Sequence, residues 1–198
     1  MHPVVFAEFE AICRARDIRG SVLEIGAMPE ESTLLNLPAL LRVREKIGLN
    51  KAGASTFRGF KILEGEANHM SAFADQCFDA VLCNAVLEHD PYFWKTLAEI
   101  RRVVRVGGLV AIGTPGYAEL RGEKKFRRWL GRLAPLTRNP DGWALQHATL
   151  TLGVHNFPGD YYRFSEQAFR DVFFEGMTEV VIRSVLVPPR LIGSGIRI

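Results

Sequence analysis

Two short apolar runs, separated by about fifty residues, constrain the fold of this chain more than any other feature. The first reads Val-Leu-Glu-Ile-Gly over residues 22–26, and the second reads Phe-Asp-Ala-Val-Leu-Cys-Asn over residues 78–84. Each run is nearly continuous in apolar residues and ends in small or polar ones, which is typical of strands buried in a parallel sheet. Ligands bind where the carboxyl ends of such strands meet, so the sequence predicts a ligand crevice at that edge.

Helical and extended segments alternate along the first half of the chain, as in an α/β fold. Apolar spacing predicts a first helix over residues 4–16. Asp90 and Pro91 predict the start of a longer helix that ends at Gly107. A loop is expected over residues 51–59, which are polar and interrupted by glycine. Strands are predicted at residues 21–25, 45–49, 60–63, 78–83 and 109–113.

The end of the chain predicts a helix followed by two paired strands. Ser165 is a good N-cap for a helix that carries Phe169 and ends at Gly176. Residues 179–187 and 190–198 are rich in β-formers and are joined by only two prolines. This link is too short for a parallel crossover, so the two strands are expected to be antiparallel.

These motifs, in this order, resemble the class I S-adenosylmethionine-dependent methyltransferases of the small-molecule type (methyltransferase type 11). Motif I of that family reads V-L-E-I-G and its fourth strand reads F-D-x-V, while residues 99–108 resemble its next helix and Gly-Gly turn. The resemblance covers about residues 20–117. It implies a single domain over residues 1–198 with a Rossmann-like, seven-stranded, mostly parallel sheet, helices on both faces and an antiparallel last strand.

The same resemblance places S-adenosylmethionine at the strand ends. Glu24 and Gly26 would meet its methionine part, Asn50 stands where the family has an acid for the ribose hydroxyls, and Glu66 stands where it has an acid near the adenine amine. Glu24 as a cap of loop amides and Asn50 as an ordinary turn residue are the competing interpretations. The cofactor positions implied are Glu24, Gly26, Asn50, Glu66, Ala67, Asn84 and Ala85.

Two departures from the family pattern leave a second class of function open. Residues 27–31 read Ala-Met-Pro-Glu-Glu where the family has two more glycines, and Asn50 lacks the usual charge. A non-catalytic, methyltransferase-like binding protein is therefore the alternative to an enzyme. A nicotinamide dinucleotide is disfavoured more strongly, because its pyrophosphate needs the missing glycines of G-x-G-x-x-G.

A long segment, residues 117–162, occupies the place where related methyltransferases build substrate lids. Between residues 118 and 140 it carries seven basic residues against two acidic ones, together with Phe126 and Trp129. Such a segment can contact an anionic membrane surface, bind an acidic substrate or cover the core. A nucleic-acid partner is disfavoured, because no RNA-binding module accompanies the basic run.

Residues 155–165 resemble the H-x-x-P-x-D-Y-x-R-F-[ST] stretch of bacterial methyltransferases of sugar and cell-surface polymer pathways. The resemblance implies a small-molecule or glycan-like acceptor. His155 and His89 are the candidate bases, with a local structural role as the alternative for each. No metal site is predicted, because His147 and His155 lack carboxylate or cysteine support. Candidate acceptor contacts are Tyr117, Asp160, Tyr161 and Arg163.

Composition bears mainly on where the protein works. Three cysteines without C-x-x-C spacing predict neither a disulfide framework nor a zinc site. Glu8 and Glu10 interrupt the apolar N-terminal stretch, which therefore does not read as a signal peptide. These features favour a cytoplasmic location, and a net charge of +3 implies no polyanionic partner by itself.

Overall fold

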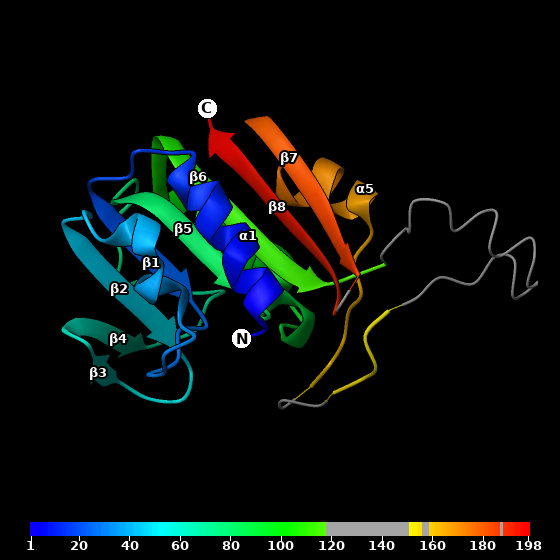
Figure 1. Ribbon diagram of the computed structural model, residues 1–198, viewed down its shortest axis with the longest axis horizontal. Coiled ribbons are helices and arrows are strands. Elements are labelled where there is room, and N and C mark those ends of the chain that lie inside the picture. Colours follow the sequence, from blue (N-terminus) through cyan, green and yellow to red (C-terminus); the bar gives the residue numbers. More distant parts are fainter. Residues whose placement is uncertain (118–150, 156–158, 187) are drawn as a thin grey trace, which may run out of the picture.

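The computed structural model describes residues 1–117, 151–155, 159–186 and 188–198. Its centre is one eight-stranded sheet with the strand order β3-β4-β2-β1-β5-β6-β8-β7 (Figure 1). The strands are β1 (Ser21–Ile25), β2 (Glu45–Asn50), β3 (Ser55–Phe57), β4 (Phe60–Glu64), β5 (Phe78–Asn84), β6 (Val104–Pro115), β7 (Met177–Leu186) and β8 (Pro189–Arg197).

Five adjacent strands of the sheet, β4, β2, β1, β5 and β6, are parallel. The order changes direction at β1, because the chain proceeds from β1 to β2 on one side and later returns to β5 on the other. A crevice forms at the carboxyl edge of the sheet at such a switch point. β8 lies antiparallel between β6 and β7, so the predicted Rossmann-like sheet and its antiparallel last strand are confirmed.

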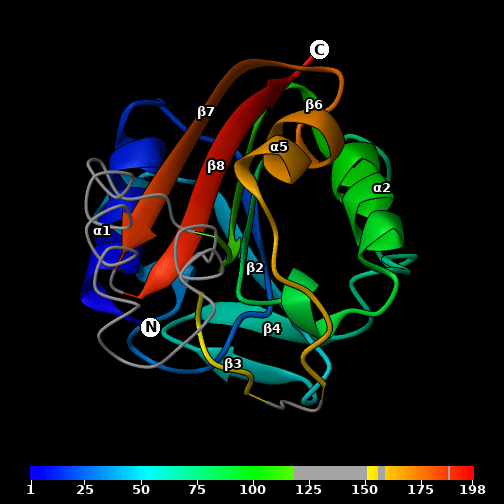
Figure 2. The ribbon, with the colours of Figure 1, turned by 90° about the vertical axis from the view of Figure 1, so that its right-hand side faces the viewer.

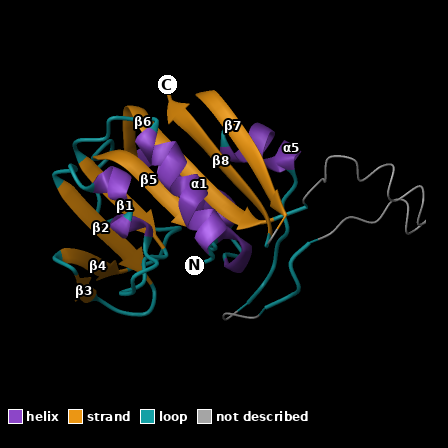
Figure 3. Ribbon diagram, in the orientation of Figure 1, coloured by secondary structure: helices purple, strands orange, loops and turns teal. Residues whose placement is uncertain are grey.

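Helices cover both faces of the sheet (Figure 2). The α1 helix (Pro3–Arg14) lies on one face, and the α2 helix (Phe93–Val103) lies on the other, beside α5 (Glu166–Ala168) and the π-helical turn η5 (Phe169–Phe173). Between β1 and β2, however, the chain forms only two 3-10 turns, η1 (Leu34–Asn36) and η2 (Pro38–Leu40) (Figure 3).

Successive residues of β1 point to opposite faces and so contribute to two separate cores. Val22 packs with Phe9 of α1, while Leu23 packs with Leu97 of α2 and Phe169 of η5. All five side chains are almost completely buried. The alternation places Glu24 on the α1 face of the sheet, where residues 27–41 cover it.

The structure differs from the prediction at residues 51–59 and at the start of α2. Residues 55–57 form the edge strand β3, which pairs antiparallel with β4, where a loop was expected. The α2 helix begins at Phe93 rather than beside Asp90. A 3-10 turn, η3 (Leu87–His89), comes directly before Asp90. Asp90 instead accepts hydrogen bonds from the backbone of Tyr92 (2.8 Å) and the hydroxyl of Thr96 (2.6 Å).

The end of α2 also differs from the prediction. Val104 already belongs to β6 and pairs with Phe78 of β5, and the register then shifts so that Leu109 pairs with Ala80. Gly107 lies inside this irregular part of β6 with a φ of +75°, so it accommodates a bulge rather than ending the helix.

The helix that follows Ser165 is confirmed, since its hydroxyl accepts a hydrogen bond from the backbone of Ala168 (3.1 Å). None of the helices in the described ranges is both long and apolar enough to cross a membrane. The basic run at 118–140 lies outside the described residues.

Packing of η5 against the sheet gives a direct stability prediction. Phe169 is fully buried, whereas Val172, in the same turn, is 42% exposed. Phe169→Ala should lower the free energy of unfolding by about 3 to 5 kcal/mol, because it leaves a cavity in the core. Val172→Ala should lower it by less than about 1 kcal/mol. Urea denaturation followed by circular dichroism measures both, and equal losses would contradict the described packing.

Candidate functional site

Polar and small residues gather where β1, β2 and β5 end. Ile25 of β1 is in register with Leu49 of β2 and with Cys83 of β5. The residues that follow Ile25, Leu49 and Cys83 therefore lie side by side at the carboxyl edge of the sheet. These three residues are Gly26, Asn50 and Asn84, all of them predicted cofactor positions.

Tight turns follow β1 and β5 at this edge. Gly26 has a φ of +81° and its N–H donates to the carbonyl of Leu49 (2.8 Å). Ala85 also lies in the left-handed region, at a φ of 57°, and its N–H donates to the carbonyl of Gly113 (2.9 Å). A non-glycine residue in this conformation is uncommon and occurs most often where a site requires a particular backbone path.

Glu24 holds the covering segment in place. Its Oε2 accepts hydrogen bonds from the hydroxyl of Thr33 and from the backbone N–H of Leu35 (3.2 Å), and the residue is only 4% exposed. Burial raises the pKa of Glu24 from 4.5 to about 7, although these hydrogen bonds oppose the shift. These contacts match the amide-capping interpretation. Both use Oε2, so neither involves Oε1.

The amide of Asn50 is likewise used within the chain. Its Nδ2 donates to the carbonyl of Ala27 (2.6 Å) and to Sδ of Met28 (3.0 Å), while its Oδ1 accepts from the backbone of Ala52 (3.0 Å). Asn50 thus fastens the loop after β1 to the end of β2. Glu66, the predicted adenine-side acid, is half-exposed and forms an ion pair with Lys51 at 2.5 Å, next to the buried Ala67.

Arg190, at the start of β8, is a residue of this edge that the sequence did not indicate. Its Nη1 donates to Oδ1 of Asn84 (2.8 Å), although the two residues are 106 positions apart. Burial lowers the pKa of Arg190, and the charge of Glu88 opposes that shift. Only the fold brings these groups together, so no local pattern could have found them.

Acidic groups collect around the end of β5. Burial is the main cause that raises the pKa of the Cys83 thiol well above 9, and the charges of Glu88, Glu24 and Asp90 raise it further. Glu88 is itself fully buried, and burial raises its pKa from 4.5 to about 7. The carboxyl edge is therefore a poorly solvated region with a surplus of carboxyl groups.

Residues 159–162 cover the turn η3 and complete this region. The backbone N–H of Tyr161 donates to the carbonyl of Glu88 (2.8 Å), and the hydroxyl of Tyr162 donates to the carbonyl of Pro91 (3.0 Å). Nδ1 of His89 is hydrogen-bonded to the carbonyl of Gly159. The two candidate bases are thereby brought together, with the rings of His89 and His155 edge to face at 5.0 Å between centroids.

Asp160 and Arg163 form a buried pair. Nη2 of Arg163 donates to Asp160 Oδ2 (2.6 Å), and Nη1 donates to Oδ1, so the pairing is bidentate. The backbone N–H of His155 also donates to Asp160 (2.8 Å). The Arg163 guanidinium holds the pKa of Asp160 well below its usual range. Tyr117 and Tyr161, by contrast, are 40% and 56% exposed.

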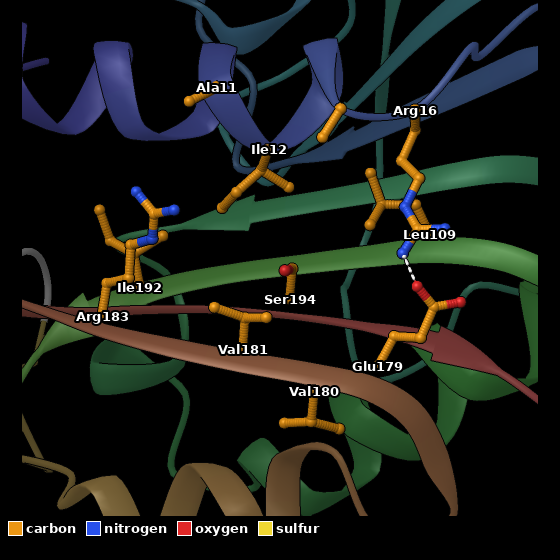
Figure 4. Close-up of a pocket in the computed structure, with 11 residues that line it drawn as sticks. Ala11, Ile12, Arg16, Leu109, Glu179, Val180, Val181, Arg183, Ile192 and Ser194 are labelled. Atoms are coloured by element: carbon orange, nitrogen blue, oxygen red, sulfur yellow. Dashed lines mark hydrogen bonds and ion pairs between the residues drawn. The ribbon is translucent and has the colours of Figure 1, made fainter.

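A separate groove of about 280 Å³ lies between α1 and strands β7 and β8 (Figure 4). Its lining includes Ile12, Leu109 and Val181, and an ion pair between Arg16 and Glu179 (2.5 Å) crosses one end. Leu109 lies six positions before the end of β6. The groove is therefore distant from the carboxyl edge.

Comparison with known sequences identifies the central part of the chain. The family described as "Methyltransferase domain" matches residues 35–112. Demethylmenaquinone methyltransferase of Thermobifida fusca is 36% identical over 67 residues, which are 34% of this chain. The chain matches only 28% of the length of that protein.

Solved structures extend the likeness to nearly the whole chain. Burkholderia thailandensis 1,6-didemethyltoxoflavin-N1-methyltransferase, crystallised with 1,6-didemethyltoxoflavin and S-adenosylhomocysteine, aligns with a TM-score of 0.64 at 15% identity over 98% of this chain and 78% of that one. Haemonchus contortus phosphoethanolamine N-methyltransferase 2, in complex with S-adenosylmethionine, gives a TM-score of 0.58 at 11% identity over 96% and 52%.

These structural likenesses show the fold of the chain. The strand order and the structural neighbours are those of the class I S-adenosylmethionine-dependent methyltransferases, and this chain has their fold. Its sequence from residue 35 to residue 112 is similar to a methyltransferase domain. The resemblance seen in the motifs is thus confirmed.

The raised pKa of Glu24 predicts a pH-dependent stability. A carboxyl group whose pKa is raised by folding contributes its full stability below the unfolded value near 4.5 and loses it as the pH rises through about 7. The stability of the wild type relative to Glu24→Gln should therefore fall by about 3 kcal/mol between pH 4.5 and pH 8. Urea unfolding at several pH values measures the difference, and parallel curves would contradict the shift.

Proposed function

We propose that this protein binds S-adenosylmethionine at the carboxyl edge of β1, β2 and β5 and transfers its methyl group to a small, hydroxyl-bearing or glycan-like acceptor. The observation that carries the proposal is the collection of polar strand ends at the switch point of a class I methyltransferase sheet. S-adenosylmethionine supplies a methyl group on a positively charged sulfur, which departs as a neutral thioether. The residues of the chain have to bind the cofactor and the acceptor, orient them and exclude water.

The donor set at this edge suits the methionine end of the cofactor. S-adenosylmethionine carries positive charge on its sulfur and on its amino group, and Glu24 contributes a buried carboxylate beside the turn at Gly26. A nearby cation favours the ionised form of such a group and would lower its raised pKa. The turns at Gly26 and Ala85 carry small residues at the ends of β1 and β5.

The adenosine end would rest on β2 and β4. Glu66 and Ala67 follow β4, and the Lys51–Glu66 ion pair is exposed enough to open for an adenine amine. Asn50 would have to release the carbonyl of Ala27 before its Nδ2 could serve the ribose, so its contacts support a loop-bracing role. The proposal therefore assigns most of the adenosine recognition to residues 65–67.

The acceptor side is proposed to be the surface where residues 151–164 meet η3. Tyr117 and Tyr161 offer exposed aromatic rings, and the Asp160–Arg163 pair keeps the segment in shape. His89 and His155 are the groups available to take the acceptor's proton. The acceptor oxygen then forms its bond to the methyl carbon while the sulfur–carbon bond breaks, and the sulfur keeps the electron pair.

A non-catalytic binding protein is the second candidate. The observation that favours it is the bracing of the loop after β1, in which Asn50 contacts Ala27 and Met28. In that case the folded protein would bind neither S-adenosylmethionine nor S-adenosylhomocysteine at millimolar concentration, and the edge would serve only to hold the loop.

Two neighbouring acids separate these candidates and test the assigned edge. Glu66→Ala should weaken S-adenosylhomocysteine binding by about tenfold, because it removes a charged hydrogen-bond acceptor for the adenine amine. Glu64→Ala, two residues earlier at the exposed end of β4, should leave the affinity unchanged. Isothermal titration calorimetry measures both. Equal affinities for the two variants would remove Glu66 from the site, and heat from no variant or wild type would favour the binding protein.

A further inference from the structure

The carboxylate of Glu88 is the least compensated polar group in the described part of the chain. The residue is 0% exposed, and neither Oε1 nor Oε2 has a hydrogen-bond donor among the described residues. A buried carboxylate without donors is costly, and such groups are usually paired with a cation or bound to a metal. Glu24, buried to a similar extent, has two donors, so of these two buried carboxylates only Glu88 lacks donors among the described residues.

Two histidines lie against this carboxylate. Nε2 of His89 is 3.9 Å from Oε1 of Glu88. One potential ligand atom from each of Glu88, His89 and His155 lies within 4.8 Å of the other two. His155 comes from a segment more than sixty residues beyond η3, so the convergence is a product of the tertiary fold.

Both imidazoles are already oriented through Nδ1. The carbonyl of Gly159 can only accept, so Nδ1 of His89 carries the hydrogen and Nε2 keeps its lone pair. Nδ1 of His155 is 3.3 Å from the carbonyl of Gly153 and 3.3 Å from Oδ2 of Asp160, two further acceptors. Metal-binding histidines are typically held in this way, with the second ring nitrogen bonded to a carbonyl or carboxylate.

We propose that Glu88, His89 and His155 form a binding site for one divalent transition-metal ion. Two imidazoles and one carboxylate, with further positions left for water or substrate, suit Zn²⁺, Fe²⁺ or Co²⁺ and not the all-oxygen preference of Mg²⁺ or Ca²⁺. Ligand atoms around a tetrahedral ion lie about 3.4 Å apart, so small side-chain movements close the triad.

This site revises the sequence-based prediction of no metal. That prediction considered His147 and His155 as a pair without carboxylate or cysteine support; His147 lies outside the described residues. The carboxylate comes instead from Glu88, and the pairing with His89 and His155 depends on the docking of residues 151–164 on η3. The sequence indicated His89 and His155 as candidate bases, but it gave no reason to single out Glu88.

Two arginines near the site could compete with a metal ion for the carboxylate of Glu88. Arg163 is neutralised by its bidentate pair with Asp160. Arg190 donates to Asn84, and its charge favours the ionised form of Glu88. The described residues nevertheless contain no Glu88–Arg190 ion pair within 4.0 Å, so the carboxylate oxygens are not committed to the guanidinium.

The site gives the acceptor region a specific chemistry, and this role rests on the proposed function. An ion held beside the end of β5 would coordinate an acceptor hydroxyl and lower its pKa, so that the proton leaves to solvent before or during methyl transfer. The substrate class implied is a chelating hydroxyl compound, such as a vicinal diol or an enediol. His89 and His155 then act as ligands rather than as free bases.

Metal binding is tested without cofactor or acceptor. Chelator-treated, dialysed full-length protein is titrated with Co²⁺ and followed by its visible absorption, and with Zn²⁺ by calorimetry. The wild type should bind one ion per chain and develop the absorption bands of a low-symmetry Co²⁺ site. Glu88→Gln and His155→Ala should each weaken binding by at least about tenfold, whereas His69→Ala, which removes an exposed histidine elsewhere, should not.

The outcomes separate this inference from the proposed function. Stoichiometric binding that survives both Glu88→Gln and His155→Ala, in variants with an unchanged circular dichroism spectrum, would place the ion elsewhere and overturn the site. Absence of Co²⁺ and Zn²⁺ binding at millimolar concentration would also overturn it. Neither result depends on S-adenosylmethionine, whose binding is measured independently on the same preparations.

Discussion

Burial of two carboxyl groups beneath the carboxyl ends of the central strands is the constraint on which this structure depends. Glu24 and Glu88 are both withdrawn from water, and burial raises the pKa of each to about 7. The chain compensates the first with a hydroxyl and a backbone N–H, which fixes the covering segment after β1. It offers no described donor to the second, which therefore remains available for a cation.

The two carboxyl groups therefore differ in how the described residues use them: Glu24 anchors the segment after β1, whereas Glu88 is the carboxylate of the proposed metal site. Glu24 holds the short 3-10 turn η1 against the sheet through its hydrogen bonds with Thr33 and Leu35. Glu88 lies at the opposite side of the switch point, after β5, where residues 159–162 close over it. The first group holds the loop after β1, and the second is proposed to bind the metal ion.

Much of the sheet could be predicted from the sequence, because short apolar runs such as residues 22–26 and 78–84 indicate buried parallel strands. The short edge strand β3 could not, since three residues that pair mainly through their backbone leave little side-chain signal. The predicted start of α2 was wrong because Asp90 is not the N-cap of the helix. Its carboxylate accepts hydrogen bonds from the backbone of Tyr92 and the hydroxyl of Thr96 instead.

The site was only partly accessible to the same reasoning. Strand-end positions such as Gly26 and Asn84 follow from strand polarity, which the sequence predicts well. The bracing role of Asn50, the contact of Arg190 with Asn84 and the meeting of Glu88 with His155 join residues that are tens of positions apart. No local periodicity reports such contacts, because they depend on how the segments dock after the elements have formed.

The location of the cofactor is the claim that the rest of the account depends on, and a crystal structure of the protein with S-adenosylhomocysteine tests it most directly. The account predicts density along the ends of β1, β2 and β5, with the amino-acid part beside Gly26 and Ala85 and the adenine beside Glu66. A ligand found instead in the groove between α1 and β7 would contradict it. So would a loop at residues 27–31 whose side chains fill the carboxyl edge and leave no space for the ligand.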